Sequence, residues 1–209
     1  LFAGTEIGLF ISWNGGRNWE PFQLNLPLTP ITDLRVHKGN LIAATSGRSF
    51  WILDDLAMIR QYRKDMPAFS VFKPSDAYIA NGGSELNGSD PEFTGASTFT
   101  GVNPANGIVL YYNLPEIKKD EHITLEITDA EGKLVRTLSS KADPKYRRWA
   151  GGPGPEPLLN KNKGLNRFVW NMRYPTMPGV GDVYIESSYS GHKASPGKYK
   201  FTLKDGAQT

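Results

Sequence analysis

The chain has 209 residues, of which 39% are hydrophobic, 22 are glycine and 15 are proline, and this composition predicts a turn-rich globular protein rather than a disordered one. Its 24 basic and 21 acidic residues give a net charge of +3, and the basic residues form no stripe interleaved with aromatic side chains, so we expect no nucleic-acid partner. The absence of cysteine excludes thiolate metal sites and cysteine nucleophiles.

Short apolar runs separated by glycine, asparagine or proline fill residues 1–62. They predict a short helical turn at 56–64, preceded by β-strands at 1–5, 8–12, 19–24, 31–37, 40–46 and 49–55. The stretch LFAGTEIGLFIS is echoed by LIAATSGRSFWIL about forty residues later, and a repeat of this length built from short strands is typical of β-propeller blades.

Beyond residue 62 the periodicity fades, and residues 63–100 are expected to form a connector with one extended segment. A second β pattern covers residues 101–209, with strands expected within 107–115, 122–140, 164–175 and 197–206. Ile123, Leu125 and Ile127 alternate with polar residues, as in a half-buried strand. This pattern predicts a β-sandwich that is interrupted by a proline-rich loop at 141–163.

A polar turn motif lies between the second and third expected strands. Ser12, Asn14, Gly16 and Trp19 stand in the order Ser-x-Asn-x-Gly-x-x-Trp, which resembles the Asp-box of sialidases and sortilin-like propellers, with asparagine in the place of the usual aspartate. The resemblance implies a structural hairpin turn whose first polar side chains bond to the turn backbone while the tryptophan packs between strands. The residue types suit that role, because asparagine and glycine tolerate a left-handed backbone and tryptophan offers a large apolar surface.

The order of motifs along the chain is similar to the C-terminal part of bacterial sortilin-like proteins with Asp-box (BNR) repeats, many of which are labelled glycosyl hydrolases. The segment after residue 100 resembles the immunoglobulin-like domain of the flagellar hook-capping protein. The resemblance implies an all-β chain with the last blade strands of a propeller at 1–62, a connector at 63–100 and an immunoglobulin-like β-sandwich at 101–209. It also implies a secreted, periplasmic or cell-surface bacterial protein, in which residues 1–62 pack on the remainder of the propeller or on another chain.

No set of residues predicts catalysis by this segment. Asp33, Asp54, Asp55 and Glu6 are the carboxylates that a glycosidase would use in pairs, but Asp54 and Asp55 directly follow a strand, where acidic residues commonly cap the next turn. Ser12 lacks the glycine elbow and the nearby histidine of a nucleophile. The longest apolar run is far shorter than the about 18 residues of a membrane helix, so we expect no membrane span. We expect no cofactor and no metal either.

Aromatic and basic side chains are the expected contacts for a glycan or a protein ligand. Tyr146, Arg148 and Trp149 lie together in the proline-rich loop, and Arg48 lies in a blade turn. Trp170 is expected in the sandwich core, because it alternates with other large apolar residues. Further aromatic residues with a side chain able to stack on a sugar are Trp51, Tyr174, Tyr184 and Tyr189.

The sequence therefore favours a non-catalytic module, structural or interacting, at the end of a propeller protein. Two alternatives stay open: part of a glycoside hydrolase whose active site lies mainly on other blades, and a sortilin-type receptor for peptides or proteins. The hydrolase requires two carboxylates that face the propeller channel, the receptor requires an apolar tunnel, and the structural module requires neither.

Overall fold

A computed structural model describes residues 1–78 and 105–205 of the chain. Nearly all regular structure in these residues is β-strand, which confirms the expected all-β class, and the helix α1 covers only Ala57–Gln61. The chain divides into two compact units, an N-terminal unit at Leu1–Tyr62 and a C-terminal unit at Arg63–Thr209. Most of the expected connector lies outside the described residues.

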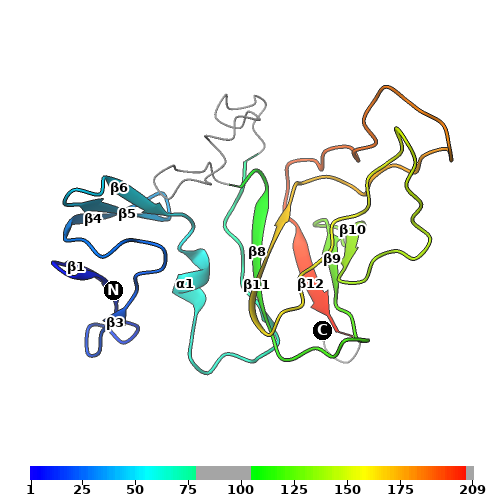
Figure 1. Cartoon of the computed structure of the whole chain (residues 1–209). Helices are drawn as coiled ribbons and strands as arrows, with labels where there is room; N and C mark the ends of the chain where they lie inside the picture. Colours follow the sequence, from blue (N-terminus) through cyan, green and yellow to red (C-terminus); the bar gives the residue numbers. More distant parts are fainter. Residues whose placement is uncertain (79–104, 206–209) are drawn as a thin grey trace. The chain divides into compact units, whose positions relative to one another are not determined.

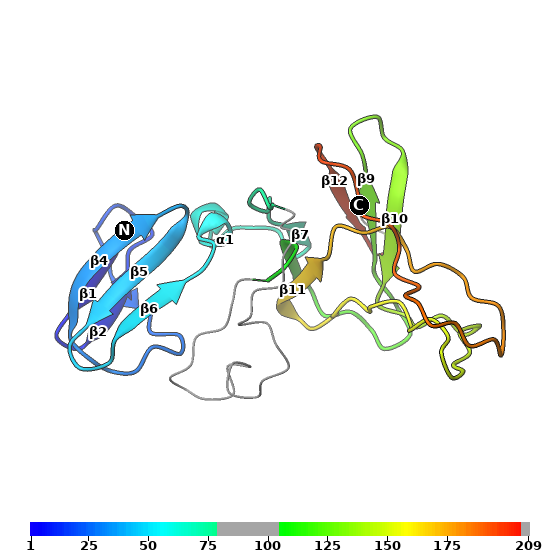
Figure 2. The same cartoon turned by 90° about the horizontal axis from the view of Figure 1, so that it is seen from above.

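The N-terminal unit contains two three-stranded antiparallel sheets (Figure 2). One sheet has the order β1-β2-β3 and the other has the order β4-β5-β6. The strands are β1 Phe2–Thr5, β2 Gly8–Ile11, β3 Glu20–Pro21, β4 Ile31–His37, β5 Asn40–Thr45 and β6 Phe50–Leu53. All six strands lie within the ranges expected from the sequence. Five of them begin and end within two residues of the expected bounds, whereas β3 is only 2 residues long and much shorter than expected.

The two sheets of the N-terminal unit pack against each other through β1 and β4. Gly4 allows this close approach, because a Cβ atom at its position would lie 2.4 Å from Ile31 Cγ2. The buried centre of the core consists of Leu9, Leu26, Leu41 and Leu56. Ile59 of α1 packs against this centre, and the N-terminal unit therefore has a hydrophobic core of its own.

The hairpins β1-β2 and β5-β6 are closed by equivalent hydrogen bonds. Thr5 Oγ1 donates a hydrogen bond of 2.9 Å to the Gly8 carbonyl oxygen, and Thr45 Oγ1 donates one of 2.7 Å to the Ser49 carbonyl oxygen. Each threonine also accepts a hydrogen bond of 3.2 Å from a backbone N–H of its own turn. The echo in the sequence is therefore a structural repeat, in which β1 and β2 are equivalent to β5 and β6.

The C-terminal unit contains two further three-stranded sheets, with the orders β11-β8-β7 and β10-β9-β12. Strand β7 is labelled in Figure 2 and the other five strands in Figure 1. The strands are β7 Ser70–Val71, β8 Ile108–Leu114, β9 Thr124–Thr128, β10 Leu134–Ser139, β11 Gly164–Trp170 and β12 Lys200–Lys204. The short strand β7 comes from the segment expected to be a connector, and it pairs with β8.

Apolar side chains of both sheets meet in one core. Trp170 is 1% exposed and belongs to this core, as the alternation of β11 predicted. Ile123, Leu125 and Ile127 are also buried in it, which confirms the expected half-buried strand around β9. The C-terminal unit therefore consists of two sheets packed around a shared core, with the proline-rich loop 141–163 running between β10 and β11.

Candidate functional site

The Asp-box-like motif forms a hydrogen-bonded turn between β2 and β3. Ser12 Oγ accepts a hydrogen bond of 2.8 Å from Gly16 N and donates one of 3.1 Å to Asn14 Oδ1. The same Asn14 oxygen accepts a hydrogen bond of 2.9 Å from Asn18 N. Gly16 has a φ of 92°, a value that glycine adopts without strain. These side chains satisfy the turn backbone, and the Ser12 hydroxyl is buried in that role.

Trp19 differs from the expectation. The residue is 43% exposed, so the large apolar burial and the packing between strands implied by the resemblance are wrong for this structure. The Trp19 ring lies instead near the turn itself, where its Cζ2 atom would be 3.8 Å from a Cβ at Gly16.

Two of the four candidate carboxylates of the N-terminal unit, Asp33 and Asp55, accept hydrogen bonds from nearby backbone N–H groups. Asp55 Oδ1 accepts a hydrogen bond of 3.0 Å from Ala57 N at the start of α1, and Asp33 Oδ1 accepts one of 2.9 Å from Leu34 N. Partial burial, and next the charge of Asp55, raise the pKa of Asp54 above its ordinary value. Asp33 and Asp55 therefore make local structural contacts, whereas the Asp54 carboxylate lies near the negative charge of Asp55.

Arg48 lies at the surface in the turn between β5 and β6. Its carbonyl oxygen accepts a hydrogen bond of 2.9 Å from Trp51 Nε1, which ties the turn to β6. The other expected ligand contacts, Tyr146, Arg148 and Trp149, belong to the C-terminal unit. The four residues therefore belong to two different units, Arg48 to the N-terminal unit and the other three to the C-terminal unit.

Tyr146, Arg148 and Trp149 together line a cavity of about 770 Å³, which we call the Trp149 cavity. Its remaining wall is the segment 150–155. Tyr146 and Trp149 are partly buried, whereas Arg148 is exposed. The structure thus brings the three predicted residues to one place, at a volume within the range of about 300–1,000 Å³ that is typical of ligand pockets.

Trp149 holds two segments of the C-terminal unit together. Its Nε1 donates a hydrogen bond of 3.1 Å to the Val183 carbonyl oxygen. Its ring lies between glycines, because a Cβ at Gly152 would be 2.5 Å from Trp149 Cε2 and a Cβ at Gly179 would be 2.8 Å from Cζ2. Part of the indole is therefore used for structure, and only its remaining edge lines the cavity.

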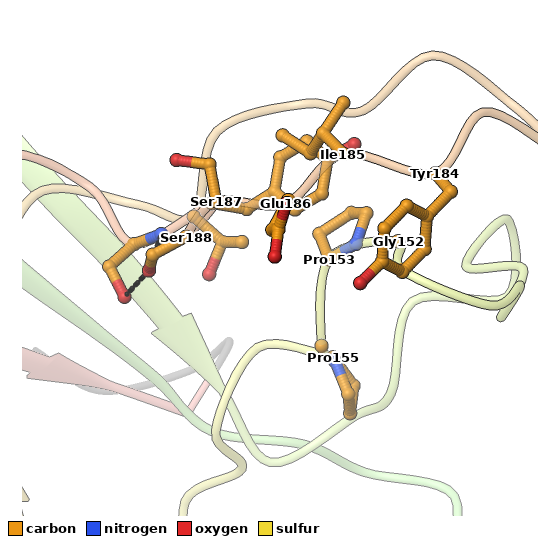
Figure 3. A pocket seen from close by; sticks show the side chains of 13 residues that line it. Gly152, Pro153, Pro155, Tyr184, Ile185, Glu186, Ser187 and Ser188 are labelled. Atoms are coloured by element: carbon orange, nitrogen blue, oxygen red, sulfur yellow. Dashed lines mark hydrogen bonds between the residues drawn. The ribbon is translucent and has the colours of Figure 1, made fainter.

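A second cavity, of about 540 Å³, shares the wall 151–155 with the first. Its opposite wall is the segment 184–190, and we call it the Tyr184 cavity (Figure 3). Tyr184 reaches from this segment toward Gly152 and Pro153 in Figure 3. The Ser188 hydroxyl donates a hydrogen bond of 2.9 Å to Ser190 Oγ, drawn as the dashed line.

A buried arginine, Arg136, lies beside the Tyr184 cavity and is linked through Glu156 to Thr176, which lines the cavity. Arg136 is 5% exposed, and its guanidinium forms an ion pair with Glu156, next to the wall 151–155. The other Glu156 oxygen accepts a hydrogen bond of 2.8 Å from Thr176 N. Burial raises the pKa of Glu156, but the hydrogen bonds from Thr176 and Arg136 and the charge of Arg136 lower it by more, so the pKa lies below its ordinary value.

The end of the loop 141–163 is fixed to the rest of the C-terminal unit. The Tyr112 hydroxyl donates a hydrogen bond of 2.7 Å to the Asn160 carbonyl oxygen, and burial raises the pKa of Tyr112 to about 12. Lys161 Nζ donates to three carbonyl oxygens of the segment before β9, at 2.9, 2.9 and 2.6 Å. Arg147, nearer the start of the loop, forms an ion pair with Asp182. The loop is therefore held at several points.

The described residues contain neither a metal-binding group nor a membrane-spanning helix. In residues 1–78 and 105–205, His, Asp and Glu side chains form no group of three with the spacing needed to hold a metal ion. No helix in that part of the chain has the length and apolar character needed to cross a membrane. The candidate site of the C-terminal unit is a surface lined by aromatic and hydroxyl side chains with few charged ones.

Arg136 and Glu156 could not be identified from motifs. Glu156 belongs to no motif, and Arg136 lies in an apolar run whose bulge has no signature in the residues themselves. Tyr184 was among the aromatic residues considered for sugar stacking, but its position opposite Gly151 depends on tertiary contacts.

Comparisons of the chain with protein-family models, with curated proteins and with solved structures give no match. The interpretation of both candidate surfaces therefore depends on their geometry and chemistry.

Proposed function

We propose that the chain is a non-catalytic interaction module, the C-terminal part of an Asp-box propeller protein. In this proposal residues 1–62 are terminal blade strands, and their partner is a strand that pairs with the outer edge of β1. That strand belongs to the remainder of the propeller or to another chain.

One observation carries this proposal: the structural repeat is complete at β5 and incomplete at β1. The hairpin β5-β6 has the strand β4 on its other side, where Asp33 and Arg35 pair with Ala44 and Ile42. The equivalent hairpin β1-β2 is extended by β3 on the β2 side, and among the described residues no strand pairs with the outer edge of β1. Because β1 is equivalent to β5, we expect a strand equivalent to β4 to pair with the outer edge of β1.

The backbone of β1 is oriented for this pairing. Leu1 and Ser12 exchange two backbone hydrogen bonds, of 2.7 and 2.8 Å. Because bonded pairs alternate along an antiparallel ladder, Phe2 and Gly4 direct their N–H and C=O groups away from β2. Their equivalents in β5 are Ile42 and Ala44, which pair with β4. An edge strand of this kind accepts a further strand through main-chain hydrogen bonds.

The contacts of the acidic side chains support a role without catalysis. Glycoside hydrolysis requires two carboxylates that face the substrate at a defined separation. Asp33 and Asp55 bond to neighbouring backbone, and Asp182 and Glu156 bond to arginines. These carboxylates hold the fold together and come from different segments.

The experiment is a fusion that supplies the strand. A second copy of residues 29–40, TPITDLRVHKGN, is placed directly before Leu1, because in the repeat these residues precede Leu41, the equivalent of Leu1. We expect the amides of Phe2 and Gly4 to become protected in hydrogen exchange and the N-terminal unit to melt at a higher temperature.

The matched control is the same fusion with proline in place of the added copies of Asp33 and Arg35. Proline has no N–H, so these two ladder hydrogen bonds cannot form. The control fusion should leave Phe2 and Gly4 as exchangeable as in the unfused chain. Equal protection in both fusions, or no protection in either, contradicts the proposal.

A further inference from the structure

The Tyr184 side chain is exposed, and one side of its ring lies against Gly151. The residue is 69% exposed, which leaves much of the side chain open to solvent. Its inner side lies on Gly151, because a Cβ at that position would be 2.3 Å from Tyr184 Cδ2 and 3.0 Å from Cγ. Gly151 has a φ of 72°, so the backbone itself favours glycine here. The result is a flat aromatic ring with one side on the backbone of Gly151 and the rest open to solvent.

The walls around this ring offer hydroxyl groups and a single kind of charge. Ser187, Ser188 and Ser190 line the cavity, and so does Glu186. The hydrogen bond from Ser188 to Ser190 leaves the Ser190 hydroxyl proton available to a ligand. Among the described residues that line the cavity there is no lysine or arginine, so nothing there attracts an anionic ligand.

We infer that the Tyr184 cavity is a binding site for a neutral saccharide, with the C–H face of a sugar ring on Tyr184 and sugar hydroxyls hydrogen-bonded to Glu186 and Ser190. Tyrosine supplies rigid contact area, and serine and glycine supply adaptable hydrogen bonding, which is a composition typical of recognition surfaces. The cavity volume of about 540 Å³ suits a small ligand or the end of a longer one.

The chemistry of the walls favours a saccharide over a peptide. A peptide is anchored mainly by apolar or aromatic side chains in closed, desolvated pockets. The Tyr184 cavity is open and has hydroxyl groups along one wall, so such an anchor would remain in contact with water. A sugar ring has an apolar face and a rim of hydroxyls, which match the aromatic ring and the polar wall. The inference concerns the C-terminal unit and does not depend on strand pairing at β1.

The test measures binding of the whole chain to five immobilised probes: cellohexaose, mannohexaose, chitohexaose, heparin and a proline-rich peptide. We expect at least one of the three neutral oligosaccharides to bind. Binding should weaken by about three- to tenfold in Tyr184→Ala, the loss of one aromatic contact. Tyr184→Phe should bind like the natural chain, because it keeps the ring and removes only the hydroxyl.

The matched control is Tyr78→Ala, which removes another tyrosine of the C-terminal unit, 89% exposed, that does not line the cavity. It should leave binding unchanged. Circular dichroism verifies that each variant is folded. If Tyr184→Ala does not fold, Glu186→Gln provides the same test, with binding weaker by about threefold because a charged acceptor becomes neutral.

Three results would overturn the inference. The first is a lack of binding to all three neutral oligosaccharides, and the second is oligosaccharide binding that Tyr184→Ala and Glu186→Gln leave intact. The third is a Tyr184-dependent interaction with heparin or the proline-rich peptide in place of the neutral oligosaccharides.

Discussion

Arg136 of β10 and Glu156 of the proline-rich loop form an ion pair in which the arginine is 5% exposed. Arg136 Nη1 also donates to Asn171 Oδ1 and to the Arg173 carbonyl oxygen, both at 3.3 Å. Glu156 in turn accepts a hydrogen bond from Thr176 N. One buried side chain thus joins a strand, the loop before β11 and the segment after it, and these last two form the walls of the Tyr184 cavity.

Glu156→Gln is expected to destabilise the C-terminal unit by about 2 kcal/mol. Removing one partner of a buried pair costs about 3–5 kcal/mol, and the value is lower here because Glu156 is partly exposed to solvent. Arg136→Met should cost less than Glu156→Gln, because it removes the buried charge instead of leaving it without a counterion. Urea unfolding followed by hydrogen-exchange mass spectrometry reports on each unit separately. A larger loss of stability in Arg136→Met than in Glu156→Gln would contradict this account.

The same pair predicts a pH dependence. The pKa of Glu156 is lower in the folded chain than its ordinary value of 4.5, because the hydrogen bonds and the charge of Arg136 outweigh burial. A carboxyl with a lowered folded pKa stabilises the fold fully above pH 4.5 and loses this effect as the pH falls through the folded pKa. The stability difference between the natural chain and Glu156→Gln should therefore be constant near neutral pH and shrink in acid. Urea midpoints between about pH 7 and about pH 3 measure it.

Thr45→Val is expected to destabilise the N-terminal unit by about 1 kcal/mol, the value of the lost hydroxyl hydrogen bonds, while the shape of the side chain is kept. Thr137→Val, in an exposed position of β10, is the control and should change the stability by less than about 0.5 kcal/mol. Thermal unfolding, with hydrogen exchange of the amide of Arg48, measures the effect. Equal stability of Thr45→Val and the natural chain would exclude the turn bond as a stabilising feature.

Asn14 tests the turn that contains the Asp-box-like motif. Asn14→Ala removes the acceptor used by Ser12 Oγ and Asn18 N, and should cost about 1 kcal/mol. Asn14→Asp keeps the acceptor and adds charge to it, so it should be as stable as the natural chain or slightly more stable. The rate of hydrogen exchange at the Asn18 amide measures the effect in both variants. A loss of protection in Asn14→Asp as large as that in Asn14→Ala would show that the amide oxygen is not what holds the turn.

Gly151 tests whether the wall of the Tyr184 cavity holds the ring in place. Gly151→Ala puts a Cβ where the Tyr184 ring lies, so the ring must move and oligosaccharide binding should fall as it does in Tyr184→Ala. Gly181→Ala is the control, because a Cβ at Gly181 meets nothing within 4 Å and Gly181 does not line the cavity. The same immobilised oligosaccharides measure both variants. Identical binding by the two would mean that the ring needs no support from Gly151.

Much of the fold was predictable because its signals are local. The alternation in β9 and the repeated threonine hairpins depend on residues near one another in the sequence, and the structure has strands at those places. The residues Tyr146, Arg148 and Trp149 lie within one loop, so their common cavity follows from proximity. The exposure of Trp19 was not predictable, because the turn motif specifies the local backbone and not which side chains cover the indole.

The environment of Arg136 was not predictable either. Simple alternation would put Val135 and Arg136 on opposite faces of β10, but the register shifts between Leu134 and Arg136 and both side chains are buried. Such a bulge changes which side chains point inward without changing the composition of the strand. The partner, Glu156, lies 20 residues away in a loop whose course is decided by tertiary contacts.

The outer edge of β1 has a consequence for the behaviour of the chain in concentrated solution. The strand, Phe2–Thr5, contains no charged residue and no proline, which are two of the devices that keep exposed edges from pairing with one another. Two uncovered copies can therefore join edge to edge, and the purified chain should aggregate increasingly as its concentration rises. A strand that covers β1 would suppress this aggregation, and so would a lysine introduced at an outward-facing position of the edge.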